Sequence, residues 1–235
     1  MEKVIKEFRF KCQMTACCCT NMEIFLNPYD ILQIANQCSI TTSEVLEKYI
    51  LFLKDKESGI IRPIFKSART GLCDFNLNKL CTIHSHRPLS CRLFPLGRID
   101  GDFYLQEAKF CQGLENNDIV QLSDYLKDDD GNIYLEMTDI YHKIVNSLKN
   151  ENLAILDNNY YNNLLNVLFY DYDYFYNGEY NHLSSREKML LSFHLINILI
   201  EEFNKKIISD NQLLIDKLYL EGDKFIAKNI KKQEN

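Results

Sequence analysis

The sequence predicts a mostly α-helical α+β protein, in which an N-terminal cysteine-rich metal-binding module with short irregular or β segments packs on a C-terminal helical region. Three observations support this. All nine cysteines lie at or before position 111 of the 235 residues, and all four prolines lie in the same stretch. Beyond about residue 120, apolar residues recur at a spacing near 3.6, which is typical of amphipathic helices.

Charge divides the chain at the same place. Residues 1–115 carry 15 Lys and Arg against 13 Asp and Glu, whereas residues 116–235 carry 12 against 20. We therefore predict a cysteine-cluster metal-binding module over 1–115, followed by an acidic, Tyr- and Asn-rich helical region over 116–235.

The first part begins with two predicted helices. In the run NPYDILQIA at 27–35, proline precedes a helical apolar pattern, and proline is favoured in the first turn of a helix. Thr41 and Glu44 form a capping box that opens a second helix, which we expect to reach about Lys54. The segments from 60 to 111 are short, and at 98–105 an Asp-Gly step predicts a β-turn, though not a strict two-residue hairpin.

The second part is predicted to be helical. An acidic turn at Asp128–Asn132 comes first, and a second capping box, SSRE, begins at Ser184. The acidic aromatic tract 170–180 is either a packed loop or a recognition loop for a basic or aromatic partner. The predicted helices are Tyr134–Leu148, Leu153–Phe169, Ser185–Ile208 and Leu213–Ile230.

Composition excludes several classes of protein. No apolar stretch approaches the roughly 20 residues needed to cross a bilayer, and the charged N-terminal segment lacks a secretory apolar core, so we expect a cytoplasmic protein without a membrane partner. A net charge of −6 argues against nucleic-acid binding. Six basic residues could still form a local patch: Arg62, Lys66, Arg69, Arg87, Arg92 and Arg98.

Clustered cysteines in a reducing compartment point to metal or redox chemistry rather than to disulfides. Thiolates are soft ligands that suit zinc, iron–sulfur clusters and Cu(I). A zinc ion or an iron–sulfur cluster commonly takes four cysteines, and a histidine sometimes replaces one of them. The candidate ligands fall into two sequence groups, Cys12, Cys17, Cys18 and Cys19, then Cys73, Cys81, Cys91 and Cys111. The eight thiols could form two four-thiolate sites, because adjacent cysteines need not bind the same metal ion. Alternatively, they could form one site, and the remaining cysteines would not bind metal.

Other residues near the thiols have more than one interpretation. Cys38 lies on the first predicted helix and is expected to pack as a small apolar residue. His84 could ligate a metal or fill space beside it, and His86 is expected at the surface. Arg87 and Arg92 flank Cys91 and are candidate cofactor-binding residues: they could recognise an anion, or offset the charge of the thiolates. The alternative is a surface pair.

The order of these motifs resembles the YkgJ family, a bacterial CxxCxxCC zinc- or iron-chelating domain. The resemblance covers about residues 8–113, and its most specific element is CTIHSHRPLSCRLFP at 81–95. FKC at 10–12, the pair Cys18-Cys19 and NPYDI at 27–31 precede this element, and Cys111 follows it. The chain departs from the family name at Thr15, where a second cysteine is implied; Cys17 could replace it, or this chain has one ligand fewer.

We expect a cytoplasmic protein that chelates zinc or iron, with an iron–sulfur cluster as one form of the iron, and whose helical half offers a surface to a protein partner. The alternative is an iron–sulfur metalloenzyme for redox chemistry or protein side-chain modification, because the chain is distantly similar to flagellin lysine N-methylases. In that case His84, Arg87 and Arg92 would line a pocket between the module and the helices.

Overall fold

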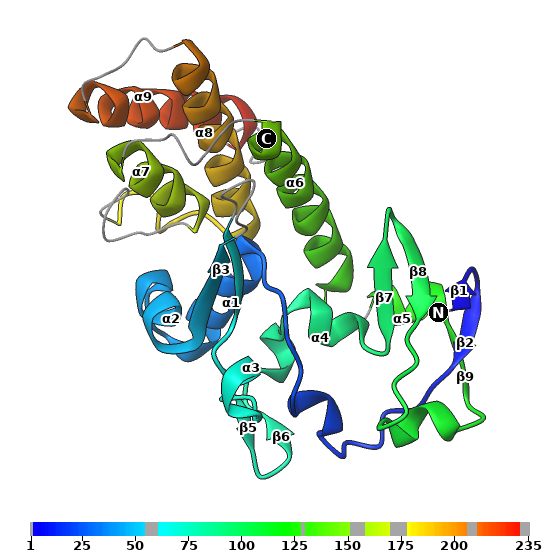
Figure 1. Cartoon of the computed structure of the whole chain (residues 1–235). Helices are drawn as coiled ribbons and strands as arrows, with labels where there is room; N and C mark the ends of the chain where they lie inside the picture. Colours follow the sequence, from blue (N-terminus) through cyan, green and yellow to red (C-terminus); the bar gives the residue numbers. More distant parts are fainter. Residues whose placement is uncertain are drawn as a thin grey trace.

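A computed structural model describes residues 2–54, 61–127, 130–150, 158–169, 178–205 and 211–230. Helices dominate this part of the chain, and the strands form small antiparallel sheets. Long helices gather at one end of the molecule, the short helices and the β5–β6 hairpin lie below them, and a small sheet stands to one side (Figure 1). The predicted fold class is therefore confirmed.

The two N-terminal helices begin where their caps predict. In α1 (Pro28–Cys38) the side chains and backbone of Asn27 and Asp30 exchange hydrogen bonds in a capping box. In α2 (Thr42–Tyr49), Thr41 and Glu44 do the same. The hydrophobic face of α1 is fully buried, with Ile31 and Ile34 both at 0% exposure.

The second helix is shorter than expected, because the residues that follow Tyr49 form a strand. β3 (Ile50–Lys54) pairs antiparallel with β4 (Ile61–Phe65). Its side chains alternate between inward and outward positions, as a strand half buried on one face requires. The prediction of a helix to Lys54 was wrong because four apolar residues in a row satisfy a helical pattern as well as a strand.

The middle of the module consists of short elements. A three-stranded sheet has the order β1 (Glu2–Val4), β8 (Asp102–Leu105), β7 (Leu96–Ile99). β7 and β8 are joined by Asp100 and Gly101 alone, at φ values of 50° and 88°. This is a strict two-residue hairpin, contrary to expectation, because Asp and Gly can both adopt positive φ. The remaining short elements are α3 (Ser67–Thr70), β5 (Asn76–Leu77), β6 (Leu80–Cys81) and α4 (Leu89–Leu93).

The second half is helical, as predicted. Its central helix, α8, contacts α6, α7 and α9, and it also packs against α1. The helices are α5 (Leu122–Lys127), α6 (Gly131–Asn150), α7 (Asn158–Leu168), α8 (Ser185–Lys205) and α9 (Asn211–Asn229). Outside the described residues lie most of the tract 170–180, the first two residues of the turn at 128–132, and one end of each of two predicted helices, Leu153–Phe169 and Ser185–Ile208.

Contacts between the N-terminal module and the helices are extensive. The Asn27 side chain donates a 2.8 Å hydrogen bond to Thr138 on α6. β2 (Glu7–Arg9) pairs with β9 (Ile119–Gln121), and the ring of Tyr125 meets that of Phe8 edge-on at 5.2 Å. The division of the chain at residue 115 stays a prediction. Of the helices in the described ranges, none combines the length and apolar character needed to cross a membrane.

Candidate metal centre

Three consecutive cysteines form a tight turn at the N-terminal edge of the site. Cys17–Cys19 make one turn of 3-10 helix, which follows Ala16 in the left-handed conformation at φ 57°. Cys19 then leads into a short antiparallel contact with residues 71–73. In this contact Cys73 donates its N–H to the Cys19 carbonyl at 2.9 Å, and Asn21 donates to the Gly71 carbonyl at 2.8 Å. Cys19 and Cys73 are therefore held side by side.

The β5–β6 hairpin brings Cys81 to the same place. Asn76 is the strand partner of Cys81, and Asn78 and Lys79 form the two-residue turn at φ 51° and 66°. The N–H of Asn76 bonds to the Cys73 carbonyl at 2.9 Å, which fixes the start of the hairpin to Cys73.

Cys91 is supplied by α4, and a buried carboxylate fixes the start of this helix. Asp30 is 1% exposed and accepts a 2.9 Å hydrogen bond from the N–H of Leu89 at the first residue of α4. Its other oxygen accepts from the N–H of Asn27, also at 2.9 Å. One carboxylate therefore joins the N-terminal ends of α1 and α4, and this places Cys91 relative to the rest of the module.

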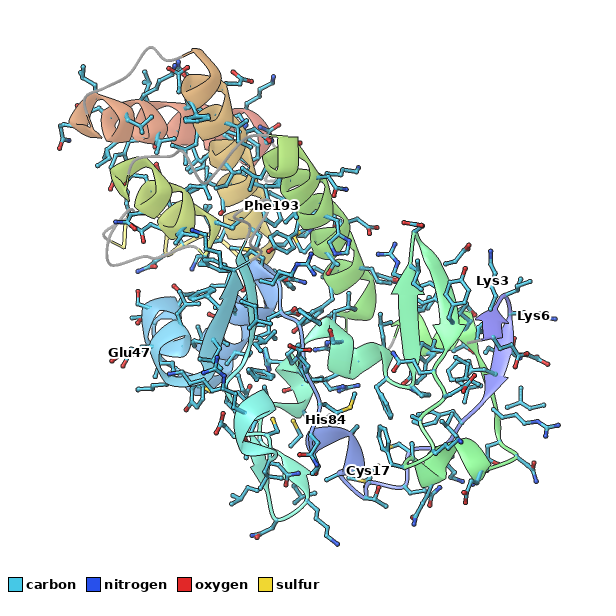
Figure 2. All side chains as sticks on the ribbon, in the orientation of Figure 1. Lys3, Lys6, Cys17, Glu47, His84 and Phe193 are labelled. Carbon is cyan, nitrogen blue, oxygen red and sulfur yellow. The ribbon has the colours of Figure 1, made fainter. Side chains whose placement is uncertain are left out.

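Four thiols form a group in which every member acts electrostatically on every other. They come from four places in the chain: Cys19, Cys73, Cys81 and Cys91. We call this group the tetrad. Figure 2 shows sulfur atoms gathered beside the labelled His84, in the lower middle of the view. Over the ranges that the structure describes, no three His, Cys, Asp or Glu side chains stand at the spacing of a finished metal-binding site.

Several groups donate hydrogen bonds to the tetrad sulfurs. The backbone N–H of Phe75 donates to Cys73, and that of Ile83 donates to Cys81. The Asn76 side chain donates to Cys19. Donors of this kind orient thiolate ligands and stabilise their negative charge, so the surroundings of these thiols fit a metal-bound state.

Burial and mutual repulsion keep most of these thiols protonated. Burial raises the pKa of Cys73 to about 11, and it also raises the pKa values of Cys81 and Cys91. Cys19 is different, because a hydrogen bond from the Cys18 thiol, aided by Asn76, lowers its pKa to about 7. A metal ion that binds here must therefore displace protons from most of the sulfurs, which makes its affinity depend on pH.

The structure groups the thiols differently from their order in the sequence. Cys19 joins the later cysteines, whereas Cys111 leaves them and forms a hydrogen bond with Cys17. Cys18 lies between the two groups, since it acts on Cys17 as well as on Cys19 and Cys91. Cys12 is exposed. All nine cysteines are free thiols, and Cys38 packs against the hydrophobic core, as expected.

The two arginines occupy distinct positions. Arg87 donates to the carbonyl of His84 at 2.7 Å, and its charge partly offsets the rise that burial causes in the pKa of Cys81. Arg92 is 6% exposed, donates to the carbonyls of Ser85 and Arg87, and lies 4.0 Å from the centre of the Tyr134 ring. It therefore holds the backbone loop that leads from Cys81 to Cys91.

The histidines are spread over the molecule. His84 is exposed, and its Nδ1 lies 3.1 Å from an Arg87 nitrogen. His86 is half-buried rather than at the surface, and its ring contacts the Ser85 hydroxyl at 2.9 Å. His142 and His194 lie on α6 and α8. His182 lies in the turn that precedes α8.

Sequence reasoning missed Asp30 and Asn76 as residues of the site. The signal for Asp30 was present, because Asn27 and Asp30 have capping-box spacing, but a cap does not reveal its second bond to α4. Asn76 has no local signal, since its bond to Cys19 depends on how the hairpin folds against the 17–19 turn.

Gly71 offers a test of the contact between 19–21 and 71–73. It has φ 88°, and a Cβ added there would lie 2.9 Å from Asn21 Oδ1. Gly101 has the same φ with nothing within 4 Å, so Gly101→Ala should cost roughly 1–2 kcal/mol from backbone conformation alone. Gly71→Ala should lower the unfolding free energy by more than Gly101→Ala does, as measured by chemical unfolding. It should also weaken metal retention, as measured by metal content. Equal stability losses with full metal content in both variants would contradict this.

Comparison with protein-family models matches residues 11–112 to the family described as CxxCxxCC, putative zinc- or iron-chelating domain. No curated protein and no solved structure matches the chain. The matched residues include every cysteine of the tetrad, together with Cys17, Cys18 and Cys111. Residues 11–112 of this chain are thus similar to the CxxCxxCC family, whose model describes a zinc- or iron-chelating domain.

Proposed function

We propose that this is a cytoplasmic protein that binds zinc, iron or an iron–sulfur cluster through Cys19, Cys73, Cys81 and Cys91. One observation carries the proposal: these four thiols all interact with one another although they come from four separate places in the chain. Four thiolates are the complete ligand set of a structural zinc ion or of a common iron–sulfur cluster.

A metal at the tetrad would connect the short elements of the module. The 17–19 turn, the start of the β5–β6 hairpin, its end and α4 each contribute one thiol. Short elements bury little apolar surface by themselves, so metal-binding free energy would add directly to folding free energy. The ion would then be structural or would be carried for delivery, and the helical half would offer a partner surface. Ligation by Cys12, Cys17, Cys18 and Cys111 stays a prediction.

A metalloenzyme with an iron–sulfur cluster is the second candidate, and one observation favours it. A small pocket lies between α4, α5 and α6, and its lining includes Arg87, Arg92 and Tyr125. Both arginines border the loop that leads to Cys91, so an anionic group in the pocket would lie next to the proposed centre. The arrangement agrees with a cluster that acts on a bound substrate.

Metal identity separates the two candidates. The protein would be purified without oxygen, and one sample would be used for elemental analysis, acid-labile sulfide and a visible spectrum. Stoichiometric zinc and a colourless solution would support the structural or carrier role and would exclude the iron–sulfur metalloenzyme. Iron with sulfide and a brown colour would favour the enzyme. Neither metal, with the thiols kept reduced, would overturn the proposal.

A further inference from the structure

One buried guanidinium holds the loop between Cys81 and Cys91. Arg92, the residue after Cys91, is 6% exposed. Its Nε donates a 2.9 Å hydrogen bond to the Arg87 carbonyl, and one of its terminal nitrogens donates to the Ser85 carbonyl. Both carbonyls lie between two cysteines of the tetrad, so the position of the guanidinium affects how Cys81 and Cys91 lie relative to each other.

The guanidinium lies against an aromatic ring from the second half of the chain. Tyr134 belongs to α6 and is 2% exposed, and the centre of its ring lies 4.0 Å from the Arg92 guanidinium carbon. A cation over the face of an aromatic ring is attracted by the ring, most strongly where both groups are removed from water. The rings of Tyr29 and Tyr134 also meet edge-on, with their centres 5.0 Å apart. The Tyr134 ring is therefore held in place, and it holds the Arg92 side chain in turn.

The helix that carries Tyr134 is anchored to the N-terminal module at two more points. Asn27, the cap of α1, donates to the Thr138 hydroxyl at 2.8 Å. Arg98 on β7 donates to both carboxylate oxygens of Asp139, and the longer of these two hydrogen bonds measures 3.0 Å. The first turns of α6 lie beside α4 (Figure 1). These contacts fix the Tyr134 ring relative to the module.

We propose that Tyr134 is a positioning residue of the metal centre, and that it acts through Arg92 on the loop between Cys81 and Cys91. Residue 134 lies outside the segment 11–112 that is similar to the metal-chelating family. The helical half of the chain thus supplies part of the surroundings that hold these thiols ready for a metal. This inference rests on the proposed function, because Cys81 and Cys91 must be ligands for Tyr134 to affect metal binding.

The test uses the full-length protein loaded with Co²⁺ under reducing conditions without oxygen, and a competing chelator measures the affinity. Co²⁺ bound by thiolates absorbs visible light, and its spectrum depends on the geometry of the ligands. Leucine removes the aromatic face of Tyr134, and outer-shell changes weaken metal binding by about 10–100-fold, so we expect Tyr134→Leu to weaken it by about tenfold and to alter the spectrum. Tyr134→Phe keeps the aromatic face and should restore the affinity and spectrum of the wild type.

Tyr141→Leu is the matched control for the loss of a buried tyrosine. Tyr141 lies about two turns further along α6 and is 7% exposed. In the part of the chain that the structure describes, the Arg92 guanidinium lies over the ring of Tyr134 and not over that of Tyr141. Tyr141→Leu should therefore lower the unfolding free energy but leave the Co²⁺ affinity and spectrum unchanged. If Tyr134 were only a core residue, the two leucine variants would behave alike.

A double-mutant cycle tests the route through Arg92. Arg92→Lys keeps the charge but lacks the planar guanidinium that donates to two carbonyls, so it should weaken Co²⁺ binding by itself. Once Arg92 is replaced, Tyr134→Leu should weaken binding little further, because both substitutions remove the same contact. Additive losses would overturn the proposed route. If Tyr134→Leu does not fold, Tyr134→Met takes its place in the cycle.

Two further results would overturn the inference. Wild-type Co²⁺ affinity and spectrum in Tyr134→Leu would show that the ring does not act on the centre, while the tetrad would stand as the metal site. Equal losses in Tyr134→Phe and Tyr134→Leu would assign the effect to the hydroxyl instead of the ring face. If the wild type binds neither Co²⁺ nor any other metal, the proposed function fails and the inference fails with it, so the two kinds of failure are distinguishable.

Discussion

Cys91→Ser is expected to lose most of the bound metal and to destabilise the module. Cys91 interacts with each of the other three tetrad thiols, and it is the one that α4 supplies. Loss of an outer-shell partner already weakens metal binding by about 10–100-fold, so loss of a direct thiolate ligand should exceed that range. Metal binding to structural sites contributes on the order of 10 kcal/mol to folding, so a large fall in melting temperature should accompany it.

Metal per chain after dialysis against a competing chelator, together with the thermal melt of the same samples, checks this prediction. Cys38→Ser is the matched control, because Cys38 is also partly buried but packs against the hydrophobic core. It should keep its metal and lose about 1 kcal/mol of stability from packing. If Cys91→Ser and Cys81→Ser both retained full metal and the wild-type melting temperature, the ligand set would be wrong.

Asp30→Asn is expected to change how stability depends on pH. Burial raises the pKa of Asp30 to about 7, and this outweighs the hydrogen bonds from Asn27 and Leu89 and the charge of Arg92, which lower it. The ordinary value is 3.8. Between these two values the folded protein holds a proton that the unfolded chain has released.

The sign follows from this difference in bound protons. A rise in pH favours the state that binds fewer protons, so the unfolding free energy should fall by about 1.4 kcal/mol per pH unit up to about pH 7 and then level off. Asp30→Asn has no carboxyl to titrate and loses this slope, although its amide cannot accept from both backbone N–H groups. The loss of unfolding free energy caused by the Asp30→Asn substitution should therefore be largest near pH 5 and smallest near pH 8.

Urea unfolding of the wild type and the variant at pH 5, 6, 7 and 8, at equal metal loading, measures the difference. Metal-linked protons then affect both proteins alike and cancel in the comparison. Asp100→Asn at the exposed β7–β8 turn is the control, because asparagine tolerates its φ of 50° and the side chain is exposed. A stability difference between wild type and Asp30→Asn that is constant over this range would contradict the prediction.

Local signals in the sequence predicted the helices well. The two capping boxes predicted from the sequence, at Thr41 and at Ser184, each begin a helix in the structure. They could be recognised because a capping box depends only on two residues three positions apart. Apolar periodicity predicted four of the helices that the structure describes in the second half, α6 to α9, but not the short helix α5. The error at 50–54 shows the limit of such signals, since that segment forms a strand through its pairing with 61–65, beyond the reach of any local pattern.

The sequence by itself determined that this chain carries a cluster of thiols of the kind that suits a soft metal, because the number, type and clustering of cysteines are properties of composition and order. Only the tertiary structure decided which thiols stand together. Cys19 and Cys91 lie far apart in the chain and meet because backbone pairing aligns 19–21 with 71–73 and because Asp30 fixes the start of α4. The backbone hydrogen bond from Lys11 to Gly113 joins the segment that precedes Cys17 to the one that follows Cys111. These are long-range contacts, whose geometry depends on the whole fold, so the spacing of cysteines along the chain could not reveal a tetrad and a separate pair.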